Sequence, residues 1–462
     1  MSIYPKIALL ALTALLSDSA IAQISKEQAA RDRAKTDSLT KVIYQQTLQS
    51  VGVKLPVLVP QAEDPTRPPG AVPRSNGNGY TDAKGMSLTR SPWGAWVNYS
   101  EDKANDYTLP DPLILKNGKA VTNAKTWWQQ RRPEIVNDYE TSVFGRVPKN
   151  TPKVTFEVTD TDKTALDGSA VKKTIIGHIE NAAYPTAQPV IKLSLFLPAN
   201  AKGAVPLMVI ASSNSNGNPQ TIKLLNNAGW AIAYFDTNAL QADNGAGLSA
   251  GIIGLVNKGK LRSAEDWGVL RAWAWGLSKS LDYFVTDKTI NAKQIGIEGH
   301  SRWGKTALLA GAMDERWAIV FASCSGSGGA SLEKRNFGEN LDLIAAENEY
   351  HWMAPNFLKY GGNWRAFPVD AHSIMSLVAP RPLFVTGGTQ DIWADPVGEF
   401  KACVAATPVY TLLGKTGITV KDFPAPDVAL INGELAFRNH EGGHTDAIDW
   451  PIFIEFAKKY FK

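Results

Sequence analysis

The chain has 462 residues, of which 44% are hydrophobic and 20% are charged, an ordinary composition for a globular protein. Its net charge of +4 is spread over mixed acidic and basic positions without a long block of one sign, so the charge gives no support to nucleic-acid binding. Two cysteines, Cys324 and Cys403, are too few for a fold built on disulfides, and their spacing leaves open whether they pair.

Residues 1–22 carry the pattern of a secretory signal peptide. A basic Lys6 precedes an apolar run over 7–16, and small residues close the segment at 20–22. A membrane span needs about 20 apolar residues, and this run is only half as long, so we expect no membrane span. A buried N-terminal helix is the alternative. We expect a secreted or periplasmic protein whose mature chain begins near Gln23.

The next part of the chain predicts an N-terminal extension over residues 23–104. Residues 25–50 are polar and favour a helix, and a proline-rich stretch from Pro56 to Pro73 follows. Because proline fixes φ and removes a backbone donor, this stretch predicts an extended linker or wrapping arm. A catalytic domain is expected over residues 105–462.

From about residue 153 the sequence alternates between strand and helix signals. Apolar runs with no polar face indicate strands of a buried parallel sheet. Ser263-Ala264-Glu265-Asp266 resembles a capping box before a long helix that ends near Phe284. The pattern predicts an α/β fold with a doubly wound, mostly parallel sheet in a three-layer sandwich. The other expected strands are 206–210, 231–235, 294–299, 318–323 and 382–388, with a helix over 305–313.

A strand runs directly into Gly299-His300-Ser301, and a helix follows. This is the context of the nucleophile elbow of α/β-hydrolases, in which a strained turn presents the serine oxygen above the sheet. The second glycine, Gly304, stands one place later than in the usual Gly-x-Ser-x-Gly pattern. A helix N-terminus after Ser301 also favours negative charge that develops beside it. We therefore expect Ser301 to be the nucleophile, with an ordinary strand-to-helix turn as the alternative.

A serine nucleophile needs a base and an orienting acid, which follow it in that fold in the order serine, acid, histidine. His444 lies in a glycine-rich loop near the C-terminus and is the expected base, whereas His440 is its rival and fits the preceding strand. Asp391 follows the strand expected over 382–388, at the edge where ligands bind in α/β sheets. Asp395 precedes a proline and is the better candidate for a turn or helix cap.

These motifs resemble the glucuronoyl esterases, carbohydrate esterase family 15. The resemblance covers most of residues 105–462, and its diagnostic segment is Gly299-His300-Ser301-Arg302-Trp303-Gly304-Lys305. Other matching segments are Leu109-Pro110-Asp111-Pro112, Ser325-Gly326-Ser327-Gly328-Gly329, Asp391-Ile392-Trp393-Ala394-Asp395-Pro396 and Gly442-Gly443-His444.

The resemblance implies a role for four further residues. Arg302 would stabilise the oxyanion, because a guanidinium stays cationic throughout the reaction. Lys305 and Glu339 would contact sugar hydroxyls, and Trp393 would pack against the sugar. Each also has a purely structural alternative. Arg302 could cap a helix, Lys305 could lie on a helix surface, Glu339 could lie in a first helical turn, and Trp393 could belong to the core.

One position departs from the family pattern. Many members, the fungal ones especially, carry the triad glutamate just before the Ser-Gly-x-Gly-Gly segment, and here Cys324 stands there. Some bacterial members use an aspartate on the later loop, which corresponds to Asp391. The departure therefore favours Asp391 as the acid and leaves Cys324 as a small packing residue.

The expected function is hydrolysis of (4-O-methyl-)glucuronic acid esters, as in the lignin–carbohydrate bonds of glucuronoxylan, through an acyl-enzyme on Ser301. An acetyl xylan esterase or another secreted carbohydrate esterase is the first alternative. An inactive carbohydrate-binding protein that stacks sugars on some of its 14 tryptophans is the second. No metal-ligand spacing or phosphate-binding loop is recognisable, so we expect no metal and no cofactor. We also expect no nucleic-acid partner, given the mixed charges, and a monomer.

Overall fold

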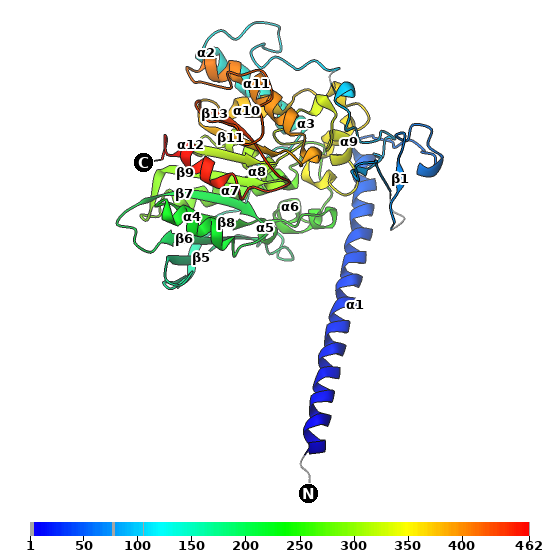
Figure 1. Ribbon diagram of the computed structural model, residues 1–462, viewed down its shortest axis with the longest axis vertical. Helices are drawn as coiled ribbons and strands as arrows, with labels where there is room; N and C mark the ends of the chain where they lie inside the picture. Colours follow the sequence, from blue (N-terminus) through cyan, green and yellow to red (C-terminus); the bar gives the residue numbers. More distant parts are fainter. Residues whose placement is uncertain (1–3, 76–78, 105, 462) are drawn as a thin grey trace.

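The computed structural model describes residues 4–75, 79–104 and 106–461, with only the backbone of residues 4–25 (Figure 1). The helices are α1 (Tyr4–Ser50), α2 (Ala124–Thr126), α3 (Arg132–Ser142), α4 (Pro219–Asn227), α5 (Thr237–Leu240), α6 (Gly251–Asn257), α7 (Val269–Phe284), α8 (Arg302–Met313), α9 (Leu341–Ile344), α10 (Ala371–Val378), α11 (Pro396–Leu412) and α12 (Trp450–Ala457). The strands are β1 (Val72–Pro73), β2 (Tyr80–Thr81), β3 (Ser87–Leu88), β4 (Val154–Asp162), β5 (Ala170–Ile179), β6 (Val190–Pro198), β7 (Val205–Ser212), β8 (Ala231–Asp236), β9 (Ile290–His300), β10 (Ile319–Ser323), β11 (Leu383–Gly388), β12 (Ala429–Leu430) and β13 (Leu435–His440).

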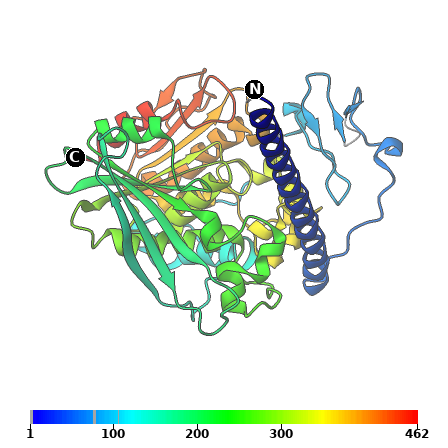
Figure 2. The ribbon, with the colours of Figure 1, turned by 90° about the horizontal axis from the view of Figure 1, so that it is seen from below.

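Ten strands form the large sheet, in the order β12-β13-β11-β10-β9-β7-β8-β6-β5-β4. The six strands from β13 to β8 in that order run parallel, whereas β12 and the β6-β5-β4 end are antiparallel. Figure 2 shows the antiparallel end twisted away from the rest of the sheet, as the right-handed twist of strands requires. The predicted mostly parallel, doubly wound α/β-hydrolase fold is confirmed.

Both faces of the sheet are covered, which explains why its central strands are apolar on both sides. In β7, Leu207 and Val209 pack into the larger core with α7, α8, α10 and α11, whereas Met208 and Ile210 pack into a second core with α4 and α12. Alternate side chains of one strand thus enter different cores, because successive residues point to opposite faces. The result is the expected three-layer sandwich.

The carboxyl ends of four neighbouring strands bring the candidate residues to one edge of the sheet. Ser301 follows β9, Cys324 follows β10, Asp391 follows β11 by a short turn, and His444 follows β13. Because β9, β10, β11 and β13 are adjacent and parallel, their carboxyl ends meet at the same edge. The topology therefore gathers residues that are far apart in the sequence.

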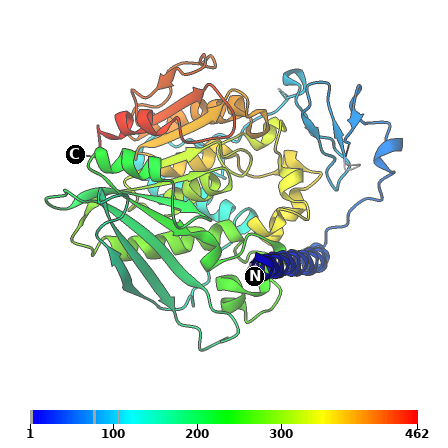
Figure 3. The same cartoon turned by 60° about the horizontal axis from the view of Figure 1, so that its bottom comes forward.

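The N-terminal extension is packed against the catalytic body. Ile43, Tyr44 and Leu48 at the end of α1 are buried, and Tyr44 Oη donates to the carbonyl of Ala345 at 3.1 Å. Strands β1–β3 form a small antiparallel sheet within the predicted N-terminal extension, mostly after the proline-rich stretch, and Gly338 N donates to Asn98 O at 2.8 Å. Figure 3 shows this blue segment beside the yellow residues of the body. The boundary at residue 104 stays a prediction.

The expected signal peptide falls on residues 1–3, which lie outside the described residues, and on the first part of α1, described as backbone alone. Signal-peptide function therefore stays a prediction. Across the described residues, the helices lack the combination of length and apolar character needed to cross a membrane.

The predicted capping box is wrong. Helix α7 begins at Val269, and its N-cap is Gly268. Ser263 and Asp266 instead close a separate turn, in which Ser263 N donates to Asp266 Oδ2 at 2.7 Å. A Cβ on Gly268 would lie 2.1 Å from the carbonyl oxygen of Trp352, so close backbone packing sets the start of the helix there. Tertiary contact has overridden a local capping signal.

Candidate active site

Ser301 occupies the sharp turn between β9 and α8, with φ of 61° and ψ of −131°. A residue with a side chain rarely adopts positive φ, and such strain costs about 1–3 kcal/mol. The Ser301 N–H donates to the carbonyl of Ser323 on β10 at 2.9 Å, which holds the turn against the neighbouring strand. The strand–turn–helix context predicted for the elbow is present.

The two glycines of the motif allow the strand and helix to approach. A Cβ on Gly299 would lie 2.0 Å from the carbonyl oxygen of Trp303, and one on Gly304 would lie 2.9 Å from the oxygen of Gly299. Side chains at either position would force the turn open. The later position of the second glycine therefore meets the same steric demand as the usual motif.

Asp391 and His444 form a close pair. Oδ2 of Asp391 lies 2.6 Å from Nδ1 of His444, and the aspartate side chain is buried whereas the imidazole is 43% exposed. Asp391 begins the short helix Ile392–Ala394 without using its side chain as a cap. A carboxylate bound to Nδ1–H fixes the tautomer in which Nε2 accepts a proton, which is what a serine nucleophile requires.

The imidazole of His444 also contacts the nucleophile's turn. Its ring centroid lies 4.2 Å from that of His300, the residue before Ser301. Burial, and then the neighbouring His444, lowers the pKa of His300 to about 4, so His300 stays neutral beside the base. Ser301 Oγ and His444 share no hydrogen bond in the described structure; such bonds often tighten only when substrate binds.

Cys324 lies beside this pair but is not an acid. Burial raises the pKa of its thiol well above the usual range, and Glu399 and Asp391 raise it further. Its Sγ contacts the carbonyl of Thr445 at 3.7 Å. Cys324 and Cys403 are both free, which answers the question of pairing that the sequence left open.

His440, the rival base, serves as an anchor for the loop. It ends β13, is fully buried, and binds Asp449 Oδ2 through Nδ1 at 2.9 Å and Gly443 O through Nε2 at 3.0 Å. Both partners only accept hydrogen bonds, so both ring nitrogens donate and the ring is cationic. Burial opposes this charge, but the hydrogen bond that His440 donates to the Asp449 carboxylate raises the pKa of His440.

Arg302 is held at the site by an unpredicted acid. Its Nη1 lies 2.6 Å from Oδ2 of Asp243, whose other oxygen accepts from His351 Nε2 at 3.0 Å and Trp352 Nε1 at 2.7 Å. Burial disfavours the Asp243 carboxylate, yet the hydrogen bonds from His351 and Trp352 and the Arg302 cation hold its pKa well below the usual range. The guanidinium also lies over the Trp352 ring, with Cζ 5.1 Å from its centroid.

Lys305 is buried and fully hydrogen-bonded within the protein. Its Nζ donates to Ser325 O at 2.7 Å, Ser327 O at 2.6 Å and Glu339 Oε2 at 2.6 Å. An ammonium has three donors, so all are occupied here. Lys305 thus positions Glu339 and the loop after β10, and a contact with a sugar hydroxyl stays a prediction that requires exchange of one of these partners.

Trp393 lies next to Glu339. Its carbonyl accepts from Glu339 N at 2.7 Å, and its ring packs against a small cluster formed by Leu88, Val97 and Leu343. The predicted sugar-binding residues are therefore connected, Lys305 to Glu339 through their side chains and Glu339 to Trp393 through the backbone. The N-terminal extension supports them through Leu88 and Val97. Asp395, by contrast, caps α11 through Gly398 N at 3.0 Å, as its sequence context predicts.

Three residues near the site escaped the sequence analysis: Asp243, His351 and Glu349. Burial raises the pKa of Glu349 to about 8, with Glu339 adding to the rise while Lys305 and Arg302 oppose it. None of the three stands in a recognisable motif. Asp243 and His351 are separated by 108 residues, so only the fold reveals their contact.

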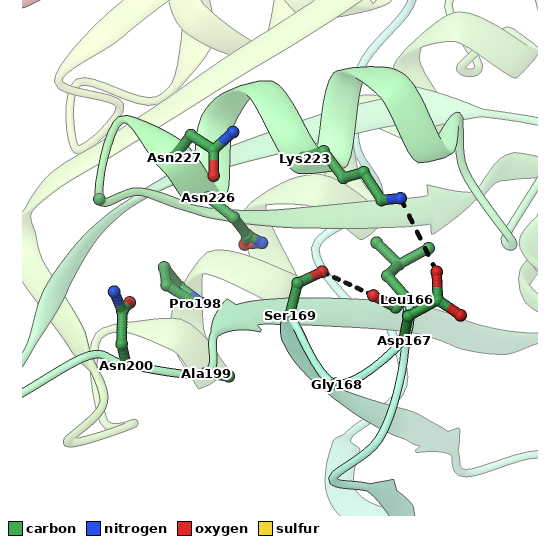
Figure 4. Close-up of a pocket in the computed structure, with 11 residues that line it drawn as sticks. Leu166, Asp167, Gly168, Ser169, Pro198, Ala199, Asn200, Lys223, Asn226 and Asn227 are labelled. Atoms are coloured by element: carbon green, nitrogen blue, oxygen red, sulfur yellow. Dashed lines mark hydrogen bonds and ion pairs between the residues drawn. The ribbon is translucent and has the colours of Figure 1, made fainter.

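A large cavity of about 670 Å³ lies away from these residues, between the 166–169 turn, the 198–200 turn and the end of α4 (Figure 4). Gly229, on the rim of the cavity, lies just before the amino end of β8. Ser301 lies just after the carboxyl end of β9, which runs parallel to β8. The cavity is thus at the opposite edge of the sheet. Its size does not make it the reaction site.

Comparisons with known proteins agree with this geometry. The family profile described as "Glucuronyl esterase, fungi" matches residues 186–414. A carbohydrate esterase from an unknown prokaryotic organism is 34% identical over 78% of this chain and 91% of its own length. The chain is also 34% identical to a solved family 15 glucuronoyl esterase, of which it covers 99%. It therefore belongs to carbohydrate esterase family 15. It is a carboxylic ester hydrolase.

Two relatives, one of them this solved esterase, extend the comparison. The structure of a family 15 glucuronoyl esterase from Teredinibacter turnerae superposes with a TM-score of 0.76 at 34% identity, covering 91% of this chain and 99% of that one. A 4-O-methyl-glucuronoyl methylesterase from Cerrena unicolor is 29% identical over 67% of this chain and 63% of its own length.

Proposed function

We propose that this family 15 enzyme hydrolyses esters of glucuronic acid, including 4-O-methyl-glucuronic acid, with Ser301, Asp391 and His444 as its triad. The observation that supports the triad best is the 2.6 Å contact between Asp391 and His444, at the sheet edge that also carries the strained turn of Ser301. The relatives named for glucuronoyl ester cleavage support the substrate class.

In the first half-reaction, His444 Nε2 takes the Ser301 hydroxyl proton while Oγ attacks the ester carbonyl carbon. Asp391 stabilises the imidazolium that forms, and Arg302 with the N-terminus of α8 stabilises the oxyanion. The imidazolium then protonates the departing alcohol, which leaves a uronyl ester on Ser301. In the second half, water gives a proton to His444 while its oxygen attacks the acyl carbon. The imidazolium then protonates Ser301 Oγ as the acyl–oxygen bond breaks, which releases the uronic acid and regenerates both the serine and the neutral base.

Three cationic or polar groups supply selectivity for a uronyl group over a small acyl group. Arg302 and Lys305 both lie over the Trp352 ring, Lys305 is paired with Glu339, and Glu339 is bonded to the Trp393 backbone. Such a set of groups suits a sugar acid with several hydroxyls. An acetyl xylan esterase would need a small acyl pocket instead. A silent binding protein would not need the Asp391–His444 pair, and five of the 14 tryptophans are fully buried and unable to stack sugars.

The natural substrate we propose is the ester between glucuronoxylan and lignin alcohols. We propose that the enzyme is a monomer that acts outside the cytoplasm after residues 1–22 are removed. The test compares kcat/KM for benzyl glucuronate with that for an aryl acetate. We expect the glucuronate ester to be preferred by at least about tenfold, equal to about 1.4 kcal/mol in transition-state binding. A preference for the acetate would overturn the assignment of the substrate.

A further inference from the structure

A thiol, an imidazole and a carboxylate converge at the catalytic edge. Cys324, Asp391 and His444 each offer one ligand atom, and these atoms all lie within 4.8 Å of one another. Thiolate sulfur, imidazole nitrogen and carboxylate oxygen are the ligands that Zn²⁺ prefers, and open zinc sites use three protein ligands with water in the fourth position. Zn–ligand bonds of about 2.0–2.3 Å place tetrahedral ligand atoms roughly 3.3–3.6 Å apart.

Small movements would bring the cluster to that geometry. The Asp391–His444 contact of 2.6 Å must open, and the thiol must approach the pair. The thiol breaks only a long contact with Thr445 O, at 3.7 Å, so the main cost at Cys324 is the loss of its proton. The imidazole is 43% exposed, so an ion has access from the His444 side although the other two side chains are buried.

We propose that Cys324, Asp391 and His444 form an inhibitory binding site for Zn²⁺. The binding rests on this cluster alone, and only its inhibitory effect rests on the proposed triad. As the ion binds, the thiol releases its proton to solvent and the sulfur–zinc bond forms. An ion on Nδ1 replaces the proton shared with Asp391, and an ion on Nε2 occupies the lone pair that accepts the Ser301 proton.

The cysteine makes this site selective for a soft-ligand metal. Mg²⁺ and Ca²⁺ prefer six or more oxygen ligands, and a thiol offers them nothing. A carboxylate in place of Cys324 would remove the sulfur ligand. The identity of residue 324 therefore decides whether the acid–base pair is sensitive to zinc.

Cobalt provides a test of binding that needs no substrate. The metal-free protein is titrated with Co²⁺, and the near-ultraviolet absorption of a cobalt–thiolate bond is recorded. The wild type and the Cys403→Ser control, which alters the other buried thiol, should both show this band and lose it when Zn²⁺ is added. Cys324→Ser should not show it. Absence of the band in the wild type, or its persistence in Cys324→Ser, would overturn the site.

Inhibition is measured on the same three proteins after removal of metals with a chelator. Zn²⁺ should inhibit the wild type and Cys403→Ser reversibly, and Mg²⁺ should not. Cys324→Ser should need at least about 100-fold more Zn²⁺, because even the outer partners of metal ligands affect affinity by about 10–100-fold. Equal inhibition of all three would place the effect elsewhere. A cobalt band without inhibition would contradict the role of His444 as the base while leaving the metal site intact.

Discussion

The Asp391 carboxylate lies 2.6 Å from Nδ1 of His444, and the two residues reach this contact from the ends of the paired strands β11 and β13. Their loops are also joined directly, since Gln390 N donates to Gly442 O at 2.7 Å. The acid and base are therefore fixed to one another through the backbone. Ser301 comes from β9, separated from β11 by β10 alone.

Asp391→Asn should lower kcat by about 10⁴ while the fold is kept, as the same change does in chymotrypsin-type proteases. An amide keeps the size of the side chain but favours the wrong imidazole tautomer and cannot stabilise the imidazolium. Steady-state hydrolysis of benzyl glucuronate measures the loss. Cys324→Ser should change the rate little, because a neutral thiol orients no cation. A nearly active Asp391→Asn, or a more damaging Cys324→Ser, would refute Asp391 as the acid.

A rescue experiment examines the same relationship from the other loop. The Cys324 sulfur lies close to both members of the pair, so Cys324→Glu can supply a carboxylate from the end of β10. In the Asp391→Asn background this change should restore part of the rate. The matched control is Cys324→Gln in the same background, which has the same shape without charge and should restore none.

Lys305→Ala should reduce activity on benzyl glucuronate at least about tenfold more than on an aryl acetate. The substitution leaves the buried Glu339 carboxylate without its cation, and breaking such a pair also costs about 3–5 kcal/mol of stability. Kinetics on both substrates and the thermal unfolding midpoint separate the two effects.

Lys334 offers a matched control for that experiment. Its buried ammonium donates to Arg365 O at 2.7 Å, whereas that of Lys305 is paired with Glu339. Lys334→Ala should destabilise the protein but affect the two substrates equally. Equal losses on both substrates for Lys305→Ala as well would assign Lys305 a structural role alone.

The His440 anchor gives stability a pH dependence of defined sign. Its pKa is raised in the folded protein, so its contribution is fully present below the unfolded value of about 6.5 and disappears as pH rises through the raised folded value. Denaturant unfolding should show that the free energy of unfolding of the wild type exceeds that of His440→Gln most in mildly acidic solution. The difference should become smaller as pH rises.

The charged groups around His440 are Asp449, its hydrogen-bond partner, and Arg438, which opposes its charge. His178→Gln alters an exposed histidine on β5 and serves as the control for a generic histidine effect. A difference between wild type and His440→Gln that stays constant with pH would show that His440 carries no folded-state charge.

Much of the fold follows from local patterns in the sequence. Apolar runs such as 206–210 and 231–235 correspond to β7 and β8, because strands covered on both faces have no polar side. The elbow and the strand before Asp391 are equally visible, since each joins an apolar run to a turn. His440 was correctly placed in the strand that precedes the His444 loop.

Contacts between distant segments could not be predicted. Asp243 holds Arg302 from 59 residues away, and neither residue type signals the other in sequence. The packing of Gly268 against Trp352 displaced the start of α7 from the capping pattern at 263–266. The burial of Lys305 with three internal acceptors depends on the loop after β10, whose path follows from the assembled sheet.

The rate of Ser301→Ala with benzyl glucuronate tests the central claim most directly. Removal of the oxygen that forms the acyl-enzyme should lower kcat by several orders of magnitude, about 10⁶ in the comparable subtilisin case, while the thermal unfolding midpoint stays near that of the wild type. The positive φ at this position is unchanged by the substitution, because alanine keeps the Cβ. A folded Ser301→Ala protein that retains more than about a tenth of the wild-type kcat would contradict the account.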